Sequence, residues 1–408
     1  MNIPKLKFKD NNGNDYPSWT NSTIGKSGYF YYGKSAPKWS ITDTATIPCV
    51  RYGELYTTHN IMVKKIYSYT NIPKENLKFS TGNEVLVPRV GEEPLDFCKC
   101  CYLPFKNVAI GEMISVYNTK NNPLFVSYMF NGTMKYKFAK FVEGGNVSNL
   151  YYSYLENIPI KLPSLKEQEK IANFLSTVDK KIENLANTIT SLENQKKGLL
   201  QQIFSQKLRF KDKNGNNYPD WEKKKLGDIA NSFDYGMNAP SKEFDGINKY
   251  IRITDIDEIT HKFINKNIVS PNGILDNKYL VNKNDILFAR TGASTGKTYI
   301  YDTNDGILYF AGFLIRANIP EKYNSYFIFL NTLTQKYKNW VKIESTRSGQ
   351  PGINAEQYKS YNVFVPCLEE QTKIADFLSA FDRKLDNQKA QLEHWQQIKK
   401  GLLQQMFV

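Results

Sequence analysis

The chain repeats itself, and this internal duplication limits the possible folds more than any other feature of the sequence. Residues 5–19 return as residues 207–221 with eleven of fifteen positions identical. The longest repeated stretch runs over residues 162–205 and again over residues 365–408. A period of about 200 residues is too long for the unit of a solenoid, so the sequence predicts a duplicated module in which a domain is followed by a shared segment.

The shared segment has the pattern of a long amphipathic helix. A proline closes the extended stretch before it, and Ser164 with Glu167 forms a capping box in the first copy. Apolar residues then alternate in steps of four and three, as in the seam of a coiled coil, with interruptions at Lys196, Gln388 and Lys399. Because the second helix must carry the chain back toward its start to pair with the first, we expect an antiparallel pair.

Between the shared segments the two copies differ strongly. Short runs of β-branched and aromatic residues, such as 249–253, 285–289 and 307–310, alternate with turn residues. These runs indicate mixed domains with many strands, so the expected fold class is α+β. We expect two related mixed α/β domains separated by a long antiparallel two-helix coiled coil, a dumbbell with a pseudo-twofold axis. The expected boundaries are 1–161 for the first domain, 162–205 for the first helix, 206–364 for the second domain and 365–408 for the second helix.

Charge and composition narrow the functional classes. The chain has 54 Lys and Arg against 40 Asp and Glu, a formal net charge of +14, which favours a polyanionic partner such as DNA. No stretch approaches 18 consecutive apolar residues, and residues 1–10 lack the apolar run of a secretory signal, so we expect a cytoplasmic protein that does not engage a membrane. The five cysteines favour reduced thiols, and the cluster of Cys98, Cys100 and Cys101 lacks the second pair or histidine that completes a metal site.

Two motifs approach enzyme signatures without matching them. Residues 292–298 resemble a phosphate-binding loop, but three residues separate the glycines where the motif requires four. Residues 122–125 lack the second proline of the Asn-Pro-Pro-aromatic loop with which adenine methyltransferases hold a flipped base. With three histidines in the chain, we expect neither a histidine-based triad nor a His-rich metal site. The sequence therefore predicts no catalytic residue, no metal site and no cofactor bound by this chain.

The two helix starts resemble those of the specificity subunits of type I restriction-modification systems. They read Leu-Pro-Ser-Leu-Lys-Glu-Gln-Glu-Lys-Ile-Ala at 162–172 and Val-Pro-Cys-Leu-Glu-Glu-Gln-Thr-Lys-Ile-Ala at 365–375, and segments 251–256 and 290–293 share the resemblance. It covers essentially the whole chain. It implies a non-catalytic subunit in which each domain, a target recognition domain, reads one half of a bipartite target in double-stranded DNA. The target is expected to be asymmetric because the two domains differ in sequence.

The resemblance also implies partners. The helical pair would set the spacing of the half-sites and dock two methyltransferase (modification) subunits, and restriction (motor and nuclease) subunits would join for cleavage. S-adenosylmethionine, ATP and Mg²⁺ would belong to those partners.

For DNA contact, Lys is expected to position phosphates, while Arg, Asn and Gln read base edges. The polar, Gly-rich segment 344–354 is the first candidate for a reading loop, followed by segment 235–242 and, in the first domain, the loop 144–146. Arg252 and Arg290 recur as Arg51 and Arg89. Because the two domains otherwise differ in sequence, this recurrence favours scaffold or phosphate roles for these arginines over the reading of bases. The candidates for DNA contact are Arg347, Ser348, Gln350, Asn354, Lys297, Asn238, Lys242, Arg252 and Arg290 in the second domain, and Lys34, Lys38, Arg51, Arg89 and Asn146 in the first.

Two other classes remain open from the sequence. A non-catalytic scaffold that pairs two protein-binding domains across a coiled coil is the first alternative, and its charge would be incidental. DNA affinity that falls steeply with salt separates this class from a DNA-binding subunit, because neutralised phosphates release counterions. An autonomous nucleotide-dependent enzyme rests only on the incomplete phosphate loop, and ATP turnover by the purified chain tests it.

Overall fold

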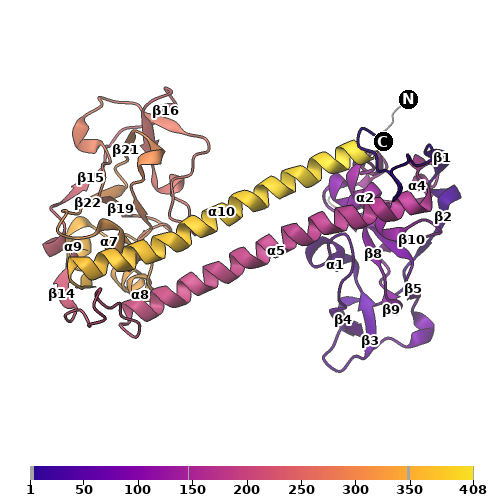
Figure 1. Ribbon diagram of the computed structural model, residues 1–408, viewed down its shortest axis with the longest axis horizontal. Coiled ribbons are helices and arrows are strands. Elements are labelled where there is room, and N and C mark those ends of the chain that lie inside the picture. Colours follow the sequence, from indigo (N-terminus) through magenta and orange to yellow (C-terminus); the bar gives the residue numbers. More distant parts are fainter. Residues whose placement is uncertain (1–3, 146, 347–349, 408) are drawn as a thin grey trace. The chain divides into compact units, whose positions relative to one another are not determined.

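A computed structural model of the chain describes residues 4–145, 147–346 and 350–407. Helices and short strands alternate through both halves, and the strands form several small sheets, so the expected mixed α+β class is confirmed (Figure 1). Among the helices in these described ranges, none is both long enough and apolar enough to cross a membrane.

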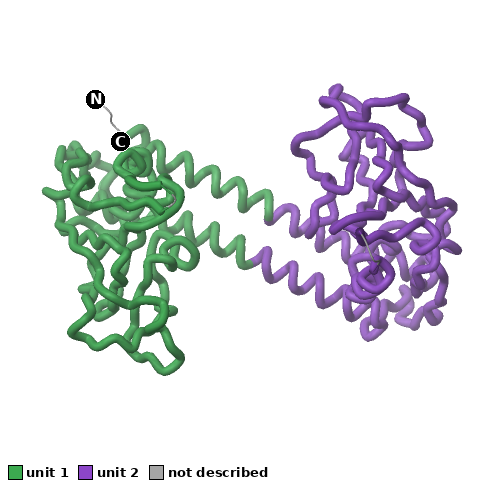
Figure 2. The backbone as a smooth tube through the Cα atoms, turned by 180° about the vertical axis from the view of Figure 1, so that it is seen from behind, with its two compact units in different colours: residues 1–187, 389–408 green, residues 188–388 purple. Residues whose placement is uncertain are grey.

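The chain divides into two compact units (Figure 2). The first unit comprises residues 1–187 with 389–408, and the second comprises residues 188–388. Both divisions fall inside a long helix. Each unit therefore contains one mixed domain, part of the helix that leaves this domain, and part of the other long helix.

Two long helices correspond to the repeated segments. Helix α5 spans Leu165–Phe204 and α10 spans Leu368–Met406. In each unit the two helices lie side by side and run in opposite directions, which confirms the predicted antiparallel pair (Figure 1). Seven of the nine predicted seam residues of α5 are at most 8% exposed, namely Ile171, Leu175, Val178, Leu185, Ile189, Leu192 and Ile203. Ile182 and Leu199 are only partly buried, and Leu200 is buried in place of Leu199.

A buried glutamine ties the start of each long helix to its domain. Gln168 donates from Nε2 to the Pro163 carbonyl at 2.9 Å, and its Oε1 accepts from the backbone N–H of Asn122 at 2.9 Å. Gln371 makes the matching pair of hydrogen bonds in the second unit, at 2.8 and 3.0 Å. The Glu-Gln pair that recurs in the sequence is thus explained by folding: the amide satisfies backbone groups that burial would otherwise leave unpaired.

The glutamate before each glutamine is also buried, but the two copies have different partners. At the start of α5 the Glu167 N–H donates to the Ser164 hydroxyl at 3.4 Å, which is one of the two hydrogen bonds of the predicted capping box. The Glu167 carboxylate accepts a hydrogen bond from the Trp19 indole, and burial raises the pKa of this carboxyl. Glu370 instead forms a two-point ion pair with Arg209, in which Nε and Nη2 each lie 2.8 Å from a carboxylate oxygen.

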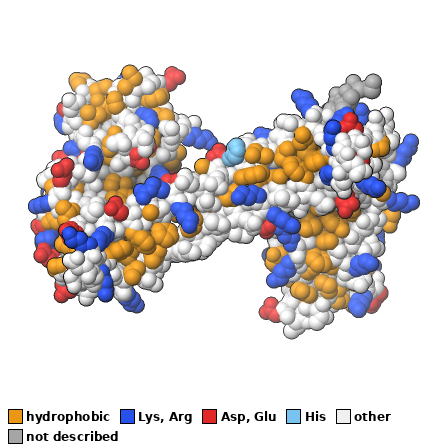
Figure 3. Space-filling model, viewed as in Figure 1, with side chains coloured by type: hydrophobic (Ala, Val, Ile, Leu, Met, Phe, Trp, Pro, Cys, Tyr) orange, Lys and Arg blue, Asp and Glu red, His pale blue; other side chains and the backbone are white. Residues whose placement is uncertain are grey.

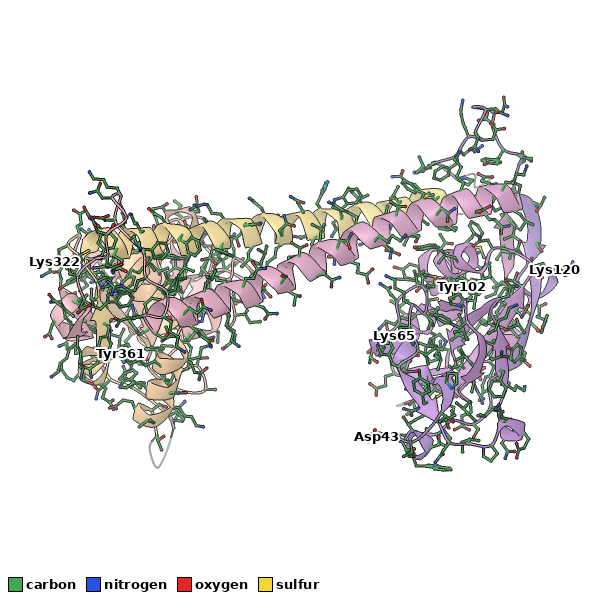
Figure 4. All side chains as sticks on the ribbon, turned by 60° about the horizontal axis from the view of Figure 1, so that its bottom comes forward. Asp43, Lys65, Tyr102, Lys120, Lys322 and Tyr361 are labelled. Atoms are coloured by element: carbon green, nitrogen blue, oxygen red, sulfur yellow. The ribbon has the colours of Figure 1, made fainter. Side chains whose placement is uncertain are left out.

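The first domain is built on two four-stranded sheets. The antiparallel sheet has the order β2-β10-β6-β8, and α2 packs against it. The second sheet has the order β4-β3-β9-β5 and lies toward the tip that carries Asp43, away from the long helices (Figure 4). The elements are β1 Thr20–Thr23, β2 Gly28–Tyr32, β3 Ile47–Val50, α1 Tyr52–Thr57, β4 Ser68–Thr70, β5 Phe79–Thr81, β6 Glu84–Pro88, β7 Val90–Gly91, β8 Cys101–Leu103, β9 Lys106–Ile110, β10 Ile114–Thr119, α2 Pro123–Gly132, α3 Lys135–Ala139, β11 Glu143–Gly144, β12 Ser148–Asn149, α4 Tyr152–Leu155 and β13 Pro159–Leu162.

The second domain repeats the antiparallel sheet with the order β15-β22-β19-β20. A two-stranded pair, β14 with β23, leads into α10 as β1 with β13 leads into α5. The duplicated sequence therefore folds into the same arrangement in both domains: a four-stranded antiparallel sheet and a two-stranded pair that leads into a long helix. We call this shared arrangement the frame. The elements are β14 Glu222–Lys225, α6 Leu226–Ile229, β15 Ser232–Tyr235, β16 Ser241–Glu243, β17 Lys249–Ile251, β18 Val269–Pro271, β19 Asp285–Ala289, β20 Thr298–Ile300, β21 Leu308–Phe310, β22 Leu314–Asn318, α7 Ser325–Thr332, α8 Gln335–Glu344, α9 Ala355–Ser360 and β23 Asn362–Val365.

Candidate nucleic-acid interface

An arginine stacked on a tyrosine stands at the same place in both domains. The Arg89 guanidinium lies 4.5 Å from the centre of the Tyr32 ring, and that of Arg290 lies 4.9 Å from the centre of the Tyr235 ring. In the first domain β10 pairs antiparallel with both β2 and β6, so β2 and β6 run the same way and their carboxyl ends meet at one edge. The second domain repeats this with β22, β15 and β19. The recurring arginine and tyrosine thus form one anchor in each frame.

A glycine follows each anchoring tyrosine because the backbone approaches another strand closely there. A Cβ atom at Gly33 would lie 2.1 Å from the Gly111 carbonyl oxygen, and one at Gly236 would lie 2.1 Å from the Ala311 carbonyl oxygen. No side chain fits such a distance. The repeated Tyr-Gly pair is therefore required by the exit of a loop from the sheet edge.

The Gly-containing loops proposed for DNA reading occupy matching places in the two frames. The Leu150 N–H donates to the Arg89 carbonyl at 2.8 Å, and the Ile353 N–H donates to the Arg290 carbonyl at 2.9 Å. Leu150 lies four residues after the candidate loop 144–146, and Ile353 is the last but one residue of the candidate loop 344–354, so each loop lies close to an anchor. Three of the proposed contacts in these loops, Arg347, Ser348 and Asn146, lie outside the described residues.

The turn 292–298, which resembles a phosphate-binding loop, lies against the candidate reading loop 344–354 of the second domain. The Gly292 N–H donates to the Pro351 carbonyl at 3.0 Å, and Thr291 pairs with Gly352 in an isolated bridge. Gln350 is exposed beside this turn. Asn354 ends the loop as the N-cap of α9, where its side chain accepts from the Gln357 N–H at 2.9 Å.

Four of the proposed contacts are exposed near the anchors. Lys34 follows Gly33 directly, and its Nζ donates to the Glu75 carbonyl at 3.3 Å. Lys38 lies in a short 3-10 helix after β2, Asn238 lies in the segment after β15, and Lys242 lies in strand β16; all three are exposed. Lys and Arg side chains are spread over the visible face of both units, as Figure 3 shows, so the position beside the anchors, not charge alone, distinguishes these residues.

Lys297 has an internal role. Its side chain is only 7% exposed, and Nζ donates to the carbonyls of Ile253 and Ile256 at 3.3 and 3.0 Å and pairs with Glu258. The ammonium group is therefore held inside the second domain. The sequence placed this lysine in a phosphate-loop pattern, but contacts with a segment about 40 residues away decide where it points.

Arg252 and Arg51 also have internal partners. Arg252 binds Asp255 through Nε and Nη2, both at 2.8 Å, and this carboxylate raises the pKa of the guanidinium. The Arg51 N–H donates to the Glu54 carboxylate at 2.7 Å, and its Nε donates to the Ala36 carbonyl at 3.3 Å. Both arginines are thus the N-cap residue of a short helical turn. The carboxylate three residues later, on Glu54 or Asp255, accepts a hydrogen bond from the arginine backbone N–H. Their recurrence is explained by the frame.

Sequence reasoning missed two exposed aromatic side chains beside these loops. Trp39 is 73% exposed next to Lys38, and Phe313 is 60% exposed next to Arg290, whose N–H donates to the Phe313 carbonyl at 3.0 Å. Exposed aromatic rings provide stacking surfaces for bases. The sequence contains 56 Phe, Trp and Tyr residues, and no local sequence pattern separates these two from the others.

A basic cleft in the first unit also escaped sequence reasoning. Its volume is about 970 Å³, and it lies between segment 58–67 and parts of both long helices. The lining includes five lysines, one of which, Lys65, is labelled in Figure 4. Two of the five, Lys64 and Lys399, are paired with carboxylates of α5. The lysines of this cleft are Lys64, Lys65, Lys135, Lys399 and Lys400.

The cysteine cluster is part of the apolar core. Cys98, Cys100 and Cys101 are at most 3% exposed, and burial raises the pKa of each thiol, which holds them neutral. Over the described ranges, no group of three or more His, Cys, Asp or Glu side chains is placed to hold a metal ion.

The frame and its loops define a class of protein: two related mixed domains, each followed by a long helix, each presenting polar loops at an Arg-Tyr anchor. The family model described as the type I restriction modification DNA specificity domain matches residues 2–194 and 218–394. The chain therefore belongs to this family.

Similar proteins agree with the family. The chain is 25% identical over 321 residues to the type I restriction enzyme MjaVIII specificity subunit of Methanocaldococcus jannaschii, covering 74% of each chain. It is 23% identical over 357 residues to the StySPI specificity subunit of Salmonella potsdam, covering 80% of this chain and 72% of that one.

Solved structures share the fold. The type I restriction-modification S subunit from M. genitalium matches with a TM-score of 0.63 at 20% identity and covers 99% of both chains. A chain from a study of complex assembly and conformational transition of the type I restriction-modification system matches with a TM-score of 0.56 at 13% identity, over 96% of this chain and 98% of that one.

Proposed function

We propose that the protein is the DNA sequence-specificity subunit of a type I restriction-modification complex. Each domain reads one half of an asymmetric bipartite target in double-stranded DNA. The long helices set the spacing of the half-sites and dock two methyltransferase subunits. Restriction subunits join the same assembly for cleavage.

One observation carries this proposal: the two domains present equivalent loops with different residues. The anchors Arg89 on Tyr32 and Arg290 on Tyr235 coincide in the frame, and a Gly-containing loop lies close to each. A frame kept in both copies while its loops diverge is what two readers of different half-sites require, because base edges are read by side chains on the loops.

Within the described loops, the contacts we assign to DNA are the exposed ones. Lys34, Lys38 and Lys242 neutralise phosphates, and Asn238 and Gln350 donate to and accept from base edges. The arginines of the frame, together with Lys297, hold the loops in place. Arg347, Ser348 and Asn146 stay assigned to the reading loops on the basis of their sequence positions.

The chemistry belongs to the partners. S-adenosylmethionine is bound by the methyltransferase subunits, and ATP and Mg²⁺ by the restriction subunits, so this chain supplies recognition and no catalytic group. The cell compartment that fits these partners is the cytoplasm, where the DNA and the cofactors are.

Mapping of methylated bases tests the proposal directly. Genomic DNA is sequenced at single-molecule resolution from cells that carry the gene, lack it, or carry it with the loop variant Gln350→Ala. We expect one bipartite methylated motif that disappears when the gene is absent. No loss of a bipartite motif on deletion refutes the proposed function.

Binding by the complex with its methyltransferase subunits separates DNA recognition from the scaffold alternative. Affinity for duplex DNA is expected to fall steeply with salt, and Lys38→Ala is expected to lower the slope of log affinity against log salt by about one. Lys322→Ala, on an exposed lysine distant in sequence from the loops, is the matched control. Affinity that does not change with salt supports the scaffold.

A further inference from the structure

The two lysines that interrupt the coiled-coil seam have carboxylate partners on the opposite helix. Lys399 Nζ lies 2.6 Å from Asp179 Oδ1 in the first unit, and Lys196 pairs with Asp382 in the second. Asp382 stands 203 residues after Asp179, and Lys399 stands 203 residues after Lys196. The two ion pairs are therefore copies of one interaction, each formed between α5 and α10 within its own unit.

A tyrosine from the domain completes each pair. The Tyr128 hydroxyl, on α2, donates to Asp179 Oδ2 at 2.7 Å, and the Tyr326 hydroxyl, on α7, donates to Asp382. Burial and the neighbouring carboxylate raise the pKa of both phenols, so both are protonated donors at neutral pH. Each carboxylate thus joins three elements: the domain helix, the long helix that leaves the domain, and the long helix that returns.

The two tyrosines do not occupy the same place in the duplicated sequence. Tyr128 lies six residues after the N-cap Asn122 of α2, whereas Tyr326 lies two residues after the N-cap Asn324 of α7. The helices correspond, but the hydroxyl is supplied from different turns. The Asp and Lys positions are thus shared by the two copies, whereas the tyrosine hydroxyl is supplied from a different position in each.

The polar groups of the triads are largely shielded. The Lys399 and Asp179 side chains are 21% and 16% exposed, and those of Lys196 and Asp382 are 20% and 26% exposed. An apolar seam by itself tolerates a shift of one helix along the other, because one Leu or Ile replaces another. A charged pair inside the seam does not, because a shift leaves both charges without partners, and such pairs specify register at a cost in stability.

We propose that Tyr128–Asp179–Lys399 and Tyr326–Asp382–Lys196 are positioning residues that fix the register of the two long helices and the attachment of each domain to them. This inference rests on the proposed function: register then sets which half-site spacing the complex accepts. A shift by one helical turn, ~5.4 Å, corresponds to between one and two base pairs at ~3.4 Å each.

The test uses the complex with its methyltransferase subunits and a DNA library. The half-sites are kept constant, and their spacing varies by up to three base pairs on either side of the native one. The variant carries Asp179→Asn with Asp382→Asn. We expect the preference for the native spacing over its neighbours to fall by about tenfold or more, as when a preference of ~1.4 kcal/mol is lost, while both half-sites are still required.

Two further variants keep the test informative. The fourfold variant Asp179→Leu, Lys399→Met, Asp382→Leu, Lys196→Met replaces both members of each pair by apolar residues, a change that is often neutral in stability. It too is expected to relax the spacing. Glu183→Gln removes an exposed pair with Lys64, whose side chains are about half exposed, and is expected to keep the native preference.

The outcomes separate the two levels of the proposal. A wild-type complex that methylates no bipartite site overturns the proposed function and this inference with it. A wild-type complex confined to one spacing, with triad variants confined to the same spacing, overturns the inference alone. Relaxed spacing in the triad variants but not in Glu183→Gln supports it.

Discussion

Glu167 and Glu370 occupy the same place in the two copies, yet the same substitution should affect them very differently. Glu370 is fully buried and accepts from two nitrogens of Arg209 at 2.8 Å each and from the Trp221 indole at 3.2 Å. Breaking a buried ion pair costs about 3–5 kcal/mol. Because the Arg209 side chain is 22% exposed, water recovers part of this cost, and we expect Glu370→Gln to lower the free energy of unfolding by about 2–4 kcal/mol.

The matching change in the first unit should be mild. The Glu167 carboxylate has the Trp19 indole as a donor, its Oε2 atom is buried with no hydrogen-bond partner, and burial raises its pKa. A neutral amide removes the cost of burying this charge, so Glu167→Gln is expected to change the unfolding free energy by less than about 1 kcal/mol at pH 7.

Calorimetry measures the difference, with hydrogen exchange to assign it to a unit. For a unit of about 200 residues each 1 kcal/mol corresponds to roughly 2–4 °C, so Glu370→Gln should lower Tm by roughly 10 °C and expose the start of α10 to exchange. Glu167→Gln should leave Tm within a few degrees. Equal decreases in Tm for the two variants would refute this reasoning, because they would mean that the ion pair between Glu370 and Arg209 contributes nothing to stability.

Three further outcomes follow from single residues. Burial lowers the pKa of His261, whose Nδ1 lies 2.9 Å from the Thr298 carbonyl oxygen, so the folded protein keeps the imidazole neutral while the unfolded chain takes up a proton near pH 6.5. The free energy of unfolding should therefore fall as the pH drops below about 6.5. Urea titrations of His261→Asn should show a weaker dependence of this free energy on pH. Gly236→Ala would place a Cβ 2.1 Å from the Ala311 carbonyl oxygen and should lower Tm sharply, and an unchanged Tm contradicts the close approach. Cys367 is partly exposed and the other four cysteines are buried, so a thiol reagent should modify one thiol quickly in the native protein and all five after denaturation. Fast reaction of more than one thiol in the native protein would contradict the buried cluster.

The long helices were predictable because their signal is periodic and repeated. The segments expected at 162–205 and 365–408 contain α5 at Leu165–Phe204 and α10 at Leu368–Met406. The antiparallel direction followed from connectivity, since a returning helix can pair with the first only in that sense. The candidate loops 344–354 and 144–146 were chosen from the sequence for their polar, Gly-containing composition, and the structure shows that Ile353 and Leu150 bond to the carbonyls of Arg290 and Arg89.

Side-chain partners were not predictable in the same way. Lys297 sits in a phosphate-loop pattern, but the carbonyls of Ile253 and Ile256 hold it inside the domain. The recurrence of Arg252 as Arg51 favoured a scaffold or phosphate role, but its partner was not predicted: Asp255 binds it at two points. In both cases the outcome depends on which acceptors the fold brings within 3.3 Å of the charged group.

Sequence alone establishes the duplication, the mixed domains, the two seams and the family, because repeats and periodicity are properties of the chain itself. The tertiary structure establishes which polar side chains are paired with other residues inside the protein. In the sequence Lys196 and Lys399 only interrupt the apolar seam. In the structure they pair with Asp382 and Asp179 on the opposite helix, about 200 residues away in the chain. Such pairs depend on long-range packing, since a charge in a seam is stabilised only by a partner that another helix delivers at hydrogen-bond distance.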